Sequence, residues 1–175
     1  AAATLNRYPD RDAVALRAAL ADYVQGRTGV IVSADQVWPA NGSNEVLQQV
    51  LQAFGGPSRT AIGFEPSYSM HRLICRGTGT EYVALDRADS FTLTPERVRS
   101  AVIEHEPDVV LVCTPNNPTG TVAGLDVVEA AYDATRGVVV VDEAYAEFSD
   151  SPSATTLLPG RERLIVVRTL SKALE

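Results

Sequence analysis

Short, purely apolar runs alternate with helical segments along most of the chain, and this alternation limits the folds open to it. The clearest runs are Val109–Cys113 and Val138–Val141, in which every residue is apolar. A strand without polar positions is buried on both faces, which is typical of a parallel sheet covered by helices. The sequence therefore predicts a three-layer α/β fold, with a mostly parallel sheet between helices on both faces.

Turn and capping residues divide the chain into the expected elements. Asp10 can cap the first helix, and Gly55-Gly56-Pro57 ends the second. We expect helices at 10–26, 46–54, 67–76, 94–104 and 125–135, and strands at 36–39, 59–64, 80–85, 109–113, 137–141 and 164–168. No internal repeat and no Pro/Gly/Ser linker marks a boundary, so one domain over residues 1–175 is predicted.

Composition and charge argue against several kinds of partner. The chain carries 22 acidic and 15 basic side chains, a formal charge of -7, and neither sign forms a block. Nucleic acid is therefore not an expected partner. No apolar run approaches the roughly 20 residues of a membrane-spanning helix. Cys75 and Cys113 form no Cys-x-x-Cys pair and no secretory signal is present, so reduced thiols and a cytoplasmic location are expected.

Polar or conformationally special residues follow five of the predicted strands. These segments are 41–45, 65–68, 114–120, 142–145 and 169–172. Because ligands of parallel sheets bind beyond the carboxyl ends of the strands, we expect all five segments to lie along one edge. His71 and His105 show no ligand spacing with the cysteines, so no metal site is expected.

Three side chains in these segments could hold a nitrogen heterocycle. The carboxylate of Asp142 could keep a pyridine nitrogen protonated, which allows such a ring to accept electrons. Tyr145 and Asn117 could hydrogen-bond a phenolic oxygen of the ring. The alternatives are a capping or magnesium-binding Asp142, a packed Tyr145 and an ordinary turn around Asn117. Either X-Pro bond of this turn could be cis.

A helix start and an aromatic side chain could hold the rest of such a ligand. Gly42, Ser43 and Asn44 precede the second predicted helix, where free N–H groups favour a phosphate. An ordinary helix cap is the alternative for this turn. Tyr68 could lie over a planar ring or could instead pack in the core.

Lys172 is the only lysine among the 15 basic residues, and it follows an apolar strand. Thr169 and Ser171 lie just before it, and their hydroxyls could contact a phosphate. In a partly desolvated pocket, a lysine has a lowered pKa and can bond covalently to a carbonyl ligand. A solvated surface lysine in an arginine-rich sequence is the alternative. The motifs of mononucleotide, dinucleotide and serine-hydrolase sites are missing from the sequence.

Taken in chain order, five short motifs resemble the class I/II aminotransferases, fold-type-I enzymes that use pyridoxal 5'-phosphate (PLP). The motifs are Gly42-Ser43-Asn44-Glu45, Pro66-Ser67-Tyr68, Asn116-Asn117-Pro118-Thr119-Gly120, Asp142-Glu143-Ala144-Tyr145 and Ser171-Lys172. Residues 6–10 and 142–148 resemble the histidinol-phosphate aminotransferase branch in particular. The resemblance covers nearly the whole chain.

This resemblance implies a role for each motif residue. Lys172 would bind PLP covalently and then carry the transferred proton, and Asp142 would pair with the pyridine nitrogen. Asn117 and Tyr145 would hold the ring oxygen, and Tyr68 would stack on the ring. The residues implied at the cofactor phosphate are Gly42, Ser43, Asn44, Thr169 and Ser171.

The resemblance also implies partners and a reaction. Tyr8 is similar to a tyrosine that reaches the cofactor phosphate of the neighbouring subunit, which implies a homodimer. The implied reaction converts histidinol phosphate and 2-oxoglutarate to imidazole-acetol phosphate and glutamate, in histidine biosynthesis. An aromatic-amino-acid aminotransferase and a threonine-phosphate decarboxylase share these cofactor residues and stay open as alternatives.

The chain is shorter than the members of the family that it resembles. Those members have an N-terminal arm and a smaller C-terminal domain, so we expect residues 1–175 to be an incomplete large PLP-binding domain that lacks both. An alternative of another class follows from this expectation. The chain by itself would then be an inactive cofactor-binding or self-associating piece, because lost substrate contacts remove transition-state binding.

Overall fold

The computed structural model describes residues 6–173, which fall into two compact units divided between Ala40 and Asn41. The first unit contains helix α1 (Val14–Thr28) and the single 3-10 turn η2 (Ala34–Gln36). The sheet and the other described helices belong to the second unit.

Helix α1 begins at Val14, later than the predicted start, although Asp10 bonds to its first residue. Asp10 Oδ2 accepts a hydrogen bond of 2.8 Å from the N–H of Val14. The helix passes the predicted end at Gly26 because Gly29, at φ 74, supplies the left-handed residue that closes it. The strand predicted at 36–39 is wrong. None of the described strands pairs with residues 36–39. An extended segment becomes a strand only when a neighbouring strand supplies hydrogen bonds to it.

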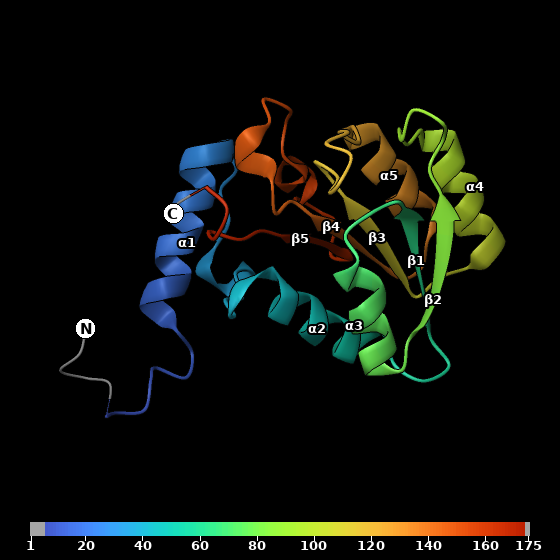
Figure 1. The fold of residues 1–175 in the computed structure, drawn as a ribbon. Coiled ribbons are helices and arrows are strands. Elements are labelled where there is room, and N and C mark those ends of the chain that lie inside the picture. The colour runs from blue at the N-terminus through green and yellow to red at the C-terminus, as the bar shows by residue number, and fades with distance from the viewer. Residues whose placement is uncertain (1–5, 174–175) are drawn as a thin grey trace. The chain divides into compact units, whose positions relative to one another are not determined.

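The second unit is built on one five-stranded sheet with the order β2-β1-β3-β4-β5 (Figure 1). Each neighbouring pair is parallel. The strands are β1 (Thr60–Glu65), β2 (Glu81–Asp86), β3 (Val109–Cys113), β4 (Val138–Asp142) and β5 (Leu164–Val167). The predicted parallel sheet is therefore confirmed.

Two pairs of helices cover the two faces of this sheet (Figure 1). Helices α2 (Gly42–Phe54) and α3 (Met70–Thr78) lie on one face, and α4 (Pro95–His105) and α5 (Leu125–Ala134) lie on the other. Single turns η3 (Ala146–Phe148) and η4 (Ala154–Leu157) follow β4. The three predicted layers are confirmed.

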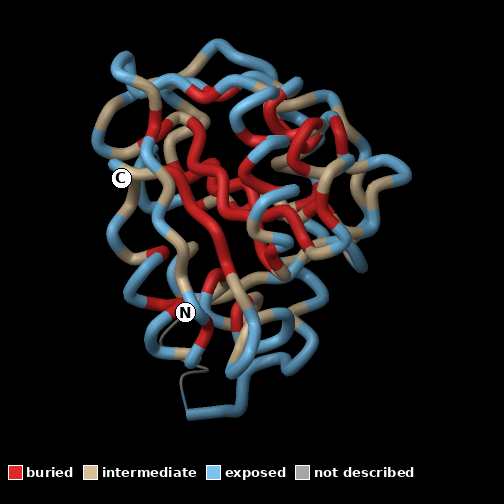
Figure 2. Tube along the Cα trace, turned by 90° about the vertical axis from the view of Figure 1, so that its right-hand side faces the viewer, coloured by how far each residue is buried: buried red, intermediate tan, exposed pale blue. Residues whose placement is uncertain are grey.

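Alternate residues of the central strands enter the two hydrophobic cores. Val110 and Val139 pack with α4 and α5, whereas Val109 and Val140 pack with α2 and α3. All five residues of β3 and all five of β4 are buried, and the buried trace runs through the centre of Figure 2. This double burial explains why both strands lack polar positions until Asp142 at the end of β4.

The strand order reverses between β1 and β3. The chain moves outward from β1 to β2 and then crosses back over β1 to β3, β4 and β5. In open parallel sheets, ligands bind at the carboxyl ends of the strands beside such a reversal. The fold thus directs attention to the segments that follow β1 and β3.

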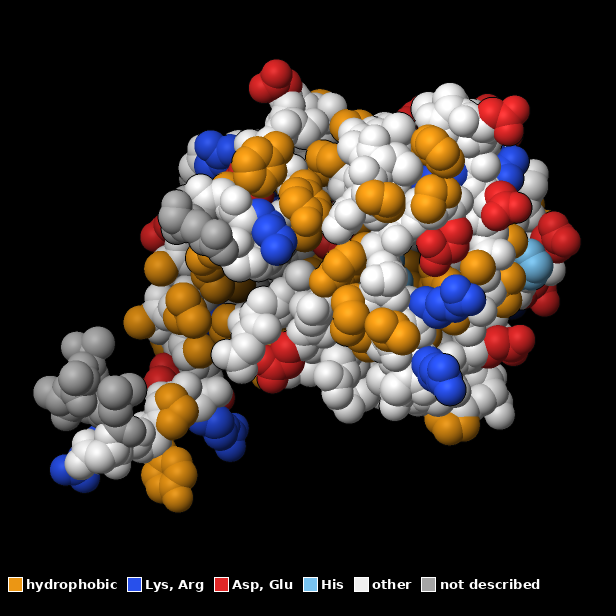
Figure 3. All heavy atoms as spheres, viewed as in Figure 1, with side chains coloured by type: hydrophobic (Ala, Val, Ile, Leu, Met, Phe, Trp, Pro, Cys, Tyr) orange, Lys and Arg blue, Asp and Glu red, His pale blue; other side chains and the backbone are white. Residues whose placement is uncertain are grey.

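No helix among the described residues is long and apolar enough to cross a membrane. Residues 6–173 contain no group of three or more His, Cys, Asp or Glu side chains that could hold a metal ion. Acidic and basic side chains are interspersed on the face shown in Figure 3.

Both cysteines are expected to resist thiol reagents while the chain is folded. Cys75 is 0% exposed and Cys113 is 3% exposed. Burial raises the pKa of Cys75 to about 12; burial, with the nearby charge of Asp142, raises the pKa of Cys113 to about 11. A disulfide-exchange reagent at pH 8 should label neither thiol in the folded chain and both in urea. Rapid labelling of two thiols without denaturant would contradict this packing.

Asp108 is expected to stabilise the amino-terminal edge of the sheet in a pH-dependent way. Its carboxylate accepts hydrogen bonds from Arg59 Nη1 at 2.5 Å and from the N–H of Thr60 at 2.9 Å. Partial burial opposes ionisation, but these hydrogen bonds and the charge of Arg59 outweigh it, so the pKa of Asp108 is lowered. Asp108→Asn should reduce the free energy of unfolding by about 1–2 kcal/mol at pH 7.

The sign of the pH dependence follows from the lowered pKa of Asp108. Its contribution is complete above the unfolded pKa of about 4 and is lost as the pH falls through the lower folded value. Urea titrations at neutral and acidic pH should therefore show the wild type and the variant converging in acid. Asp133→Asn, at an exposed position of α5, is the control. An equal difference at pH 7 and pH 3 would contradict the argument.

Candidate active site

The carboxyl edge of the sheet gathers several of the predicted site residues. Asn117, after β3, lies with its Nδ2 3.5 Å from the hydroxyl of Tyr145, after β4. The Tyr68 hydroxyl, after β1, donates a hydrogen bond of 3.2 Å to Asn44 Oδ1 at the start of α2. Asn117 and Tyr145 also line a cavity of about 370 Å³. Residues from four separate segments therefore meet at this edge.

Asp142 is held in place by a histidine that the sequence analysis considered only as a metal ligand. Asp142 is 1% exposed, its Oδ2 lies 2.9 Å from His71 Nε2, and its Oδ1 accepts a 3.1 Å hydrogen bond from the N–H of Ala144. The His71 ring meets the Tyr68 ring edge-on, with centroids 5.7 Å apart. The carboxylate is thus fixed in orientation, and His71 connects it to the Tyr68 ring.

The beginning of α2 has the geometry of an anion site. Gly42 opens the helix at φ 75, and Ser43 and Asn44 fall in its first turn. The first N–H groups of a helix have no acceptor within the helix, and the positive end of the helix dipole favours an anion there. Glu45 Oε2 accepts a hydrogen bond of 2.6 Å from the preceding N–H of Asn41. The structure places Gly42, Ser43 and Asn44, three of the five residues predicted at the phosphate, at this helix start.

Two further hydroxyls lie together after β5. Thr169 Oγ1 is 3.0 Å from Ser171 Oγ, and the N–H of Ser171 also points to Thr169 Oγ1 at 3.4 Å. Thr169 is buried, whereas Ser171 is exposed. This pair could offer two neighbouring hydroxyls to one anion.

The structure does not bring Lys172 into contact with the other candidate residues of the second unit. Lys172 is exposed and makes no hydrogen bond or ion pair with any residue between 6 and 173. Tyr8 belongs to the first unit, where its side chain is fully exposed. The role predicted for each residue stays a prediction.

The loop after β3 has an unusual backbone. The Thr114–Pro115 and Asn117–Pro118 peptide bonds are both cis, which the sequence analysis had left open for each. The Glu65–Pro66 bond, just before Tyr68, is cis as well. Proline bonds of this kind therefore occur on both sides of the reversal between β1 and β3.

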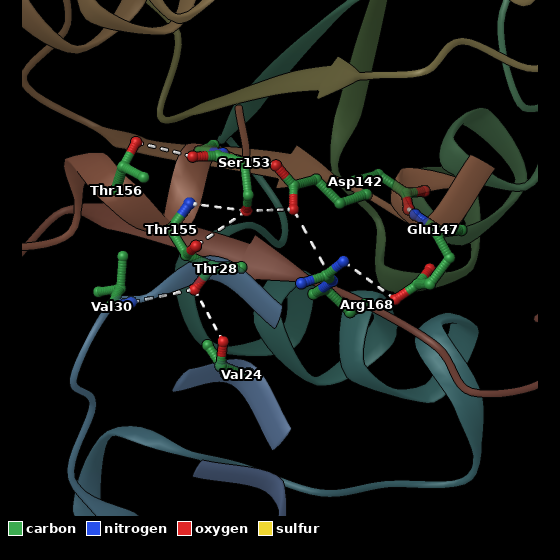
Figure 4. A network of polar contacts seen from close by, with 12 residues as sticks. Val24, Thr28, Val30, Asp142, Glu147, Ser153, Thr155, Thr156 and Arg168 are labelled. Atoms are coloured by element: carbon green, nitrogen blue, oxygen red, sulfur yellow. Dashed lines mark hydrogen bonds and ion pairs between the residues drawn. The ribbon is translucent and has the colours of Figure 1, made fainter. Parts of the chain in front are cut away.

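Buried charges connect the segments that follow β4 and β5 (Figure 4). Glu143 accepts hydrogen bonds from Ser153 Oγ at 2.7 Å and from the N–H of Ala154 at 2.6 Å. Arg168 lies 3.8 Å from Glu143 and donates to Glu147 Oε1 at 2.9 Å. Burial raises the pKa of Glu143 despite these partners. Sequence reasoning missed the network because charged residues are usually exposed.

A larger cavity of about 770 Å³ lies at the opposite edge of the sheet. It is lined in part by Arg59, Asp108 and Gly137, near the amino ends of the strands. None of the predicted site residues reaches it. We place the candidate site at the carboxyl edge because the donors converge there and because parallel sheets bind ligands at that edge.

Comparison with known proteins agrees with this geometry. Residues 1–175, the whole chain, match the family described as aminotransferase class I and II. The chain belongs to this family. The family predicted from the five sequence motifs is therefore confirmed. The five-stranded parallel sheet and its helices form the fold-type-I architecture of this family.

Two curated relatives share more than half of their aligned residues with the chain. The histidinol-phosphate aminotransferase of Frankia casuarinae is 59% identical over 179 residues, covering 99% of this chain and 45% of that protein. The Corynebacterium efficiens protein of the same name is 55% identical over 175 residues, covering 99% and 47%. The chain thus spans about half the length of the curated relatives it matches.

A solved structure shows the same fold. The histidinol-phosphate aminotransferase of Sinorhizobium meliloti, crystallised in complex with PLP, superposes with a TM-score of 0.85 at 23% identity. The match covers 98% of this chain and 46% of the other. Fold-type-I aminotransferases use PLP as their cofactor.

Proposed function

We propose that the chain contributes the PLP-binding part of a histidinol-phosphate aminotransferase. The reaction would convert histidinol phosphate and 2-oxoglutarate to imidazole-acetol phosphate and glutamate. The strongest support is the identity of 55–59% across the chain to relatives of that name. The convergence of Asn117, Tyr145 and the buried Asp142 at one sheet edge gives the proposal a physical basis.

The side chains at the carboxyl edge fit the chemical groups of PLP. Each oxygen of Asp142 has one hydrogen-bond partner in the structure, so the carboxylate keeps acceptor capacity for a protonated pyridine nitrogen. Asn117 Nδ2 and the Tyr145 hydroxyl, 3.5 Å apart, would both donate to the ring oxygen. Tyr68 would stack on the ring. When bound, PLP supplies an electron-accepting ring that stabilises charge on the substrate carbon.

The phosphate group would be held at the start of α2 and after β5. Gly42 begins helix α2, and the next two residues, Ser43 and Asn44, would supply backbone N–H groups and side-chain donors. The hydroxyls of Thr169 and Ser171 would supply the rest. Anions at helix starts are favoured by the free N–H groups and by the helix dipole.

Lys172 would act as both covalent anchor and proton carrier. Its Nζ is the only lysine amine of the chain, and it would bond to the cofactor before substrate arrives. After substrate has displaced it, the neutral amine would take the proton from the α-carbon of the substrate and deliver it to the cofactor. This role requires the exposed side chain to turn into the proposed ring site.

The proposed assembly is a cytoplasmic homodimer. Tyr8 would contact the cofactor phosphate of the partner subunit. The exposure of its side chain in the first unit leaves it available for such a contact. The name of the relatives, a biosynthetic enzyme acting on small metabolites, supports this cellular setting.

A single-turnover assay tests the substrate. The PLP-loaded chain is mixed separately with histidinol phosphate, phenylalanine and threonine phosphate, and pyridoxamine phosphate is quantified by mass spectrometry. We expect conversion at least about tenfold faster with histidinol phosphate, because a site built for a polar group rejects analogues lacking it. Faster conversion with phenylalanine, or release of carbon dioxide from threonine phosphate, would favour an alternative enzyme. Bound cofactor without any conversion would favour an inactive cofactor-binding piece.

A further inference from the structure

Asn116 connects the two segments that the proposed function assigns to the cofactor ring. Its Nδ2 donates to the carbonyl of Pro66 at 3.0 Å and to Thr119 Oγ1 at 2.7 Å. Its Oδ1 accepts from Ser67 Oγ at 2.9 Å and from Arg87 Nη2 at 3.0 Å. A side-chain amide has two N–H donors and two acceptor positions, so all four are occupied. Asn116 is 2% exposed.

The backbone of Asn116 closes the loop that carries Asn117. Its N–H donates to the carbonyl of Thr121 at 2.8 Å, and its carbonyl accepts from the N–H of Gly120 at 2.7 Å. The intervening residues form a tight loop fixed at its base. The direction of the Asn117 side chain therefore depends on where Asn116 is held.

Arg87 anchors Asn116 to the edge of the sheet. Its Nε donates to the carbonyl of Phe64 at 2.9 Å, and its Nη1 donates to the carbonyl of Phe91 at 3.2 Å. With the bond to Asn116, each of the three guanidinium nitrogens has a neutral oxygen acceptor. Arg87 is 7% exposed. A buried charge is costly unless its hydrogen bonds are satisfied, so the guanidinium holds these acceptors in defined positions.

We propose that Asn116 and Arg87 are positioning residues that set the distance between Tyr68 and Asn117. Tyr68 follows Pro66 and Ser67, and both of these residues are hydrogen-bonded to Asn116. Asn117 is the next residue in sequence after Asn116. The bonds cross the reversal between β1 and β3 and join the two segments beyond the carboxyl ends of these strands. The inference rests on the proposed function, which assigns the stacking ring and the ring-oxygen donor.

Arg87→Met and Arg163→Met form a matched pair for the test. Arg163 Nη1 also donates to two backbone carbonyls, those of Thr135 at 2.8 Å and Gly137 at 2.9 Å, at the amino edge. Each variant loses several charged hydrogen bonds to neutral oxygens, and their melting temperatures measure the general cost. A purely structural role for Arg87 predicts the same behaviour in both variants.

Hydrogen exchange without cofactor tests the link itself. In Arg87→Met, the amides of Asn116 and Gly120 should exchange at least about tenfold faster, because the loop base loses a charged hydrogen bond. In Arg163→Met they should keep the wild-type rate, and Asn116→Leu, which also loses the Arg87–Asn116 hydrogen bond, should behave like Arg87→Met. Equal exchange of this loop in both arginine variants would overturn the inference.

Pyridoxine 5'-phosphate tests the consequence for the ligand, since it cannot bond to Lys172. We expect its dissociation constant to rise about tenfold in Arg87→Met and to stay within about twofold of wild type in Arg163→Met. Equal affinity in all variants would overturn the positioning role and leave the proposed function standing. A wild type that binds no pyridoxine 5'-phosphate would count against the proposed function, and hydrogen exchange would still decide the link.

Discussion

Asp142→Ala is expected to weaken PLP binding by at least about 100-fold. The carboxylate is 1% exposed, and it would be the only acidic partner of the pyridine nitrogen in the proposed site. Removing one member of a buried charged pair costs about 3–5 kcal/mol, and about 2.7 kcal/mol corresponds to 100-fold in affinity. Titration of the PLP absorption band against the chain measures the effect.

Two further variants separate this effect from general loss of structure. Asp133→Ala, at an exposed position of α5, should bind PLP like the wild type. His71→Gln should give a smaller loss than Asp142→Ala, because it removes the 2.9 Å contact and leaves the carboxylate in place. Binding by Asp142→Ala within threefold of wild type would remove Asp142 from the proposed cofactor site.

Phe64→Ala is expected to reduce the free energy of unfolding by about 3–5 kcal/mol, the usual cost of emptying a buried aromatic position. Phe64 is 1% exposed on β1 and packs in the core beneath α4 and α5. Because a domain of this size is stable by only about 5–15 kcal/mol, the loss would be a large fraction. Urea unfolding followed by circular dichroism gives the value.

Phe54→Ala is the matched control for the core prediction. Phe54 ends α2 and is 45% exposed, so its truncation should cost less than about 1 kcal/mol. The two variants remove the same atoms, from a buried strand position in one and from a partly exposed helix end in the other. Similar losses in both would mean that the core beneath α4 and α5 is not packed as described.

The elements best predicted from the sequence are those whose environment leaves a local pattern. β3 has the predicted bounds, and β4 begins and ends one residue later than predicted. Both strands are buried on two faces, and this burial produces the apolar runs from which they were predicted. Residues 36–39 have a composition suitable for a strand, but they do not form one. Their conformation depends on a neighbouring strand, which a local pattern does not reveal.

The same distinction applies to the candidate site. Asp142 and Asn117 were found because each follows a predicted strand, and parallel strands end at one edge. His71 and Arg87 were missed because their roles arise from contacts 71 and 29 residues away along the chain, with Asp142 and Asn116. Such partners become visible only when the strand order is known.

The central claim, that Lys172 holds PLP, has a direct test. The chain is incubated with PLP, reduced with borohydride and digested, and the adduct is located by mass spectrometry. Because Lys172 is the only lysine, the assignment competes only with the N-terminal amine. The account predicts about one adduct per chain, on Lys172. An adduct confined to the N-terminal amine, or no adduct, would contradict it.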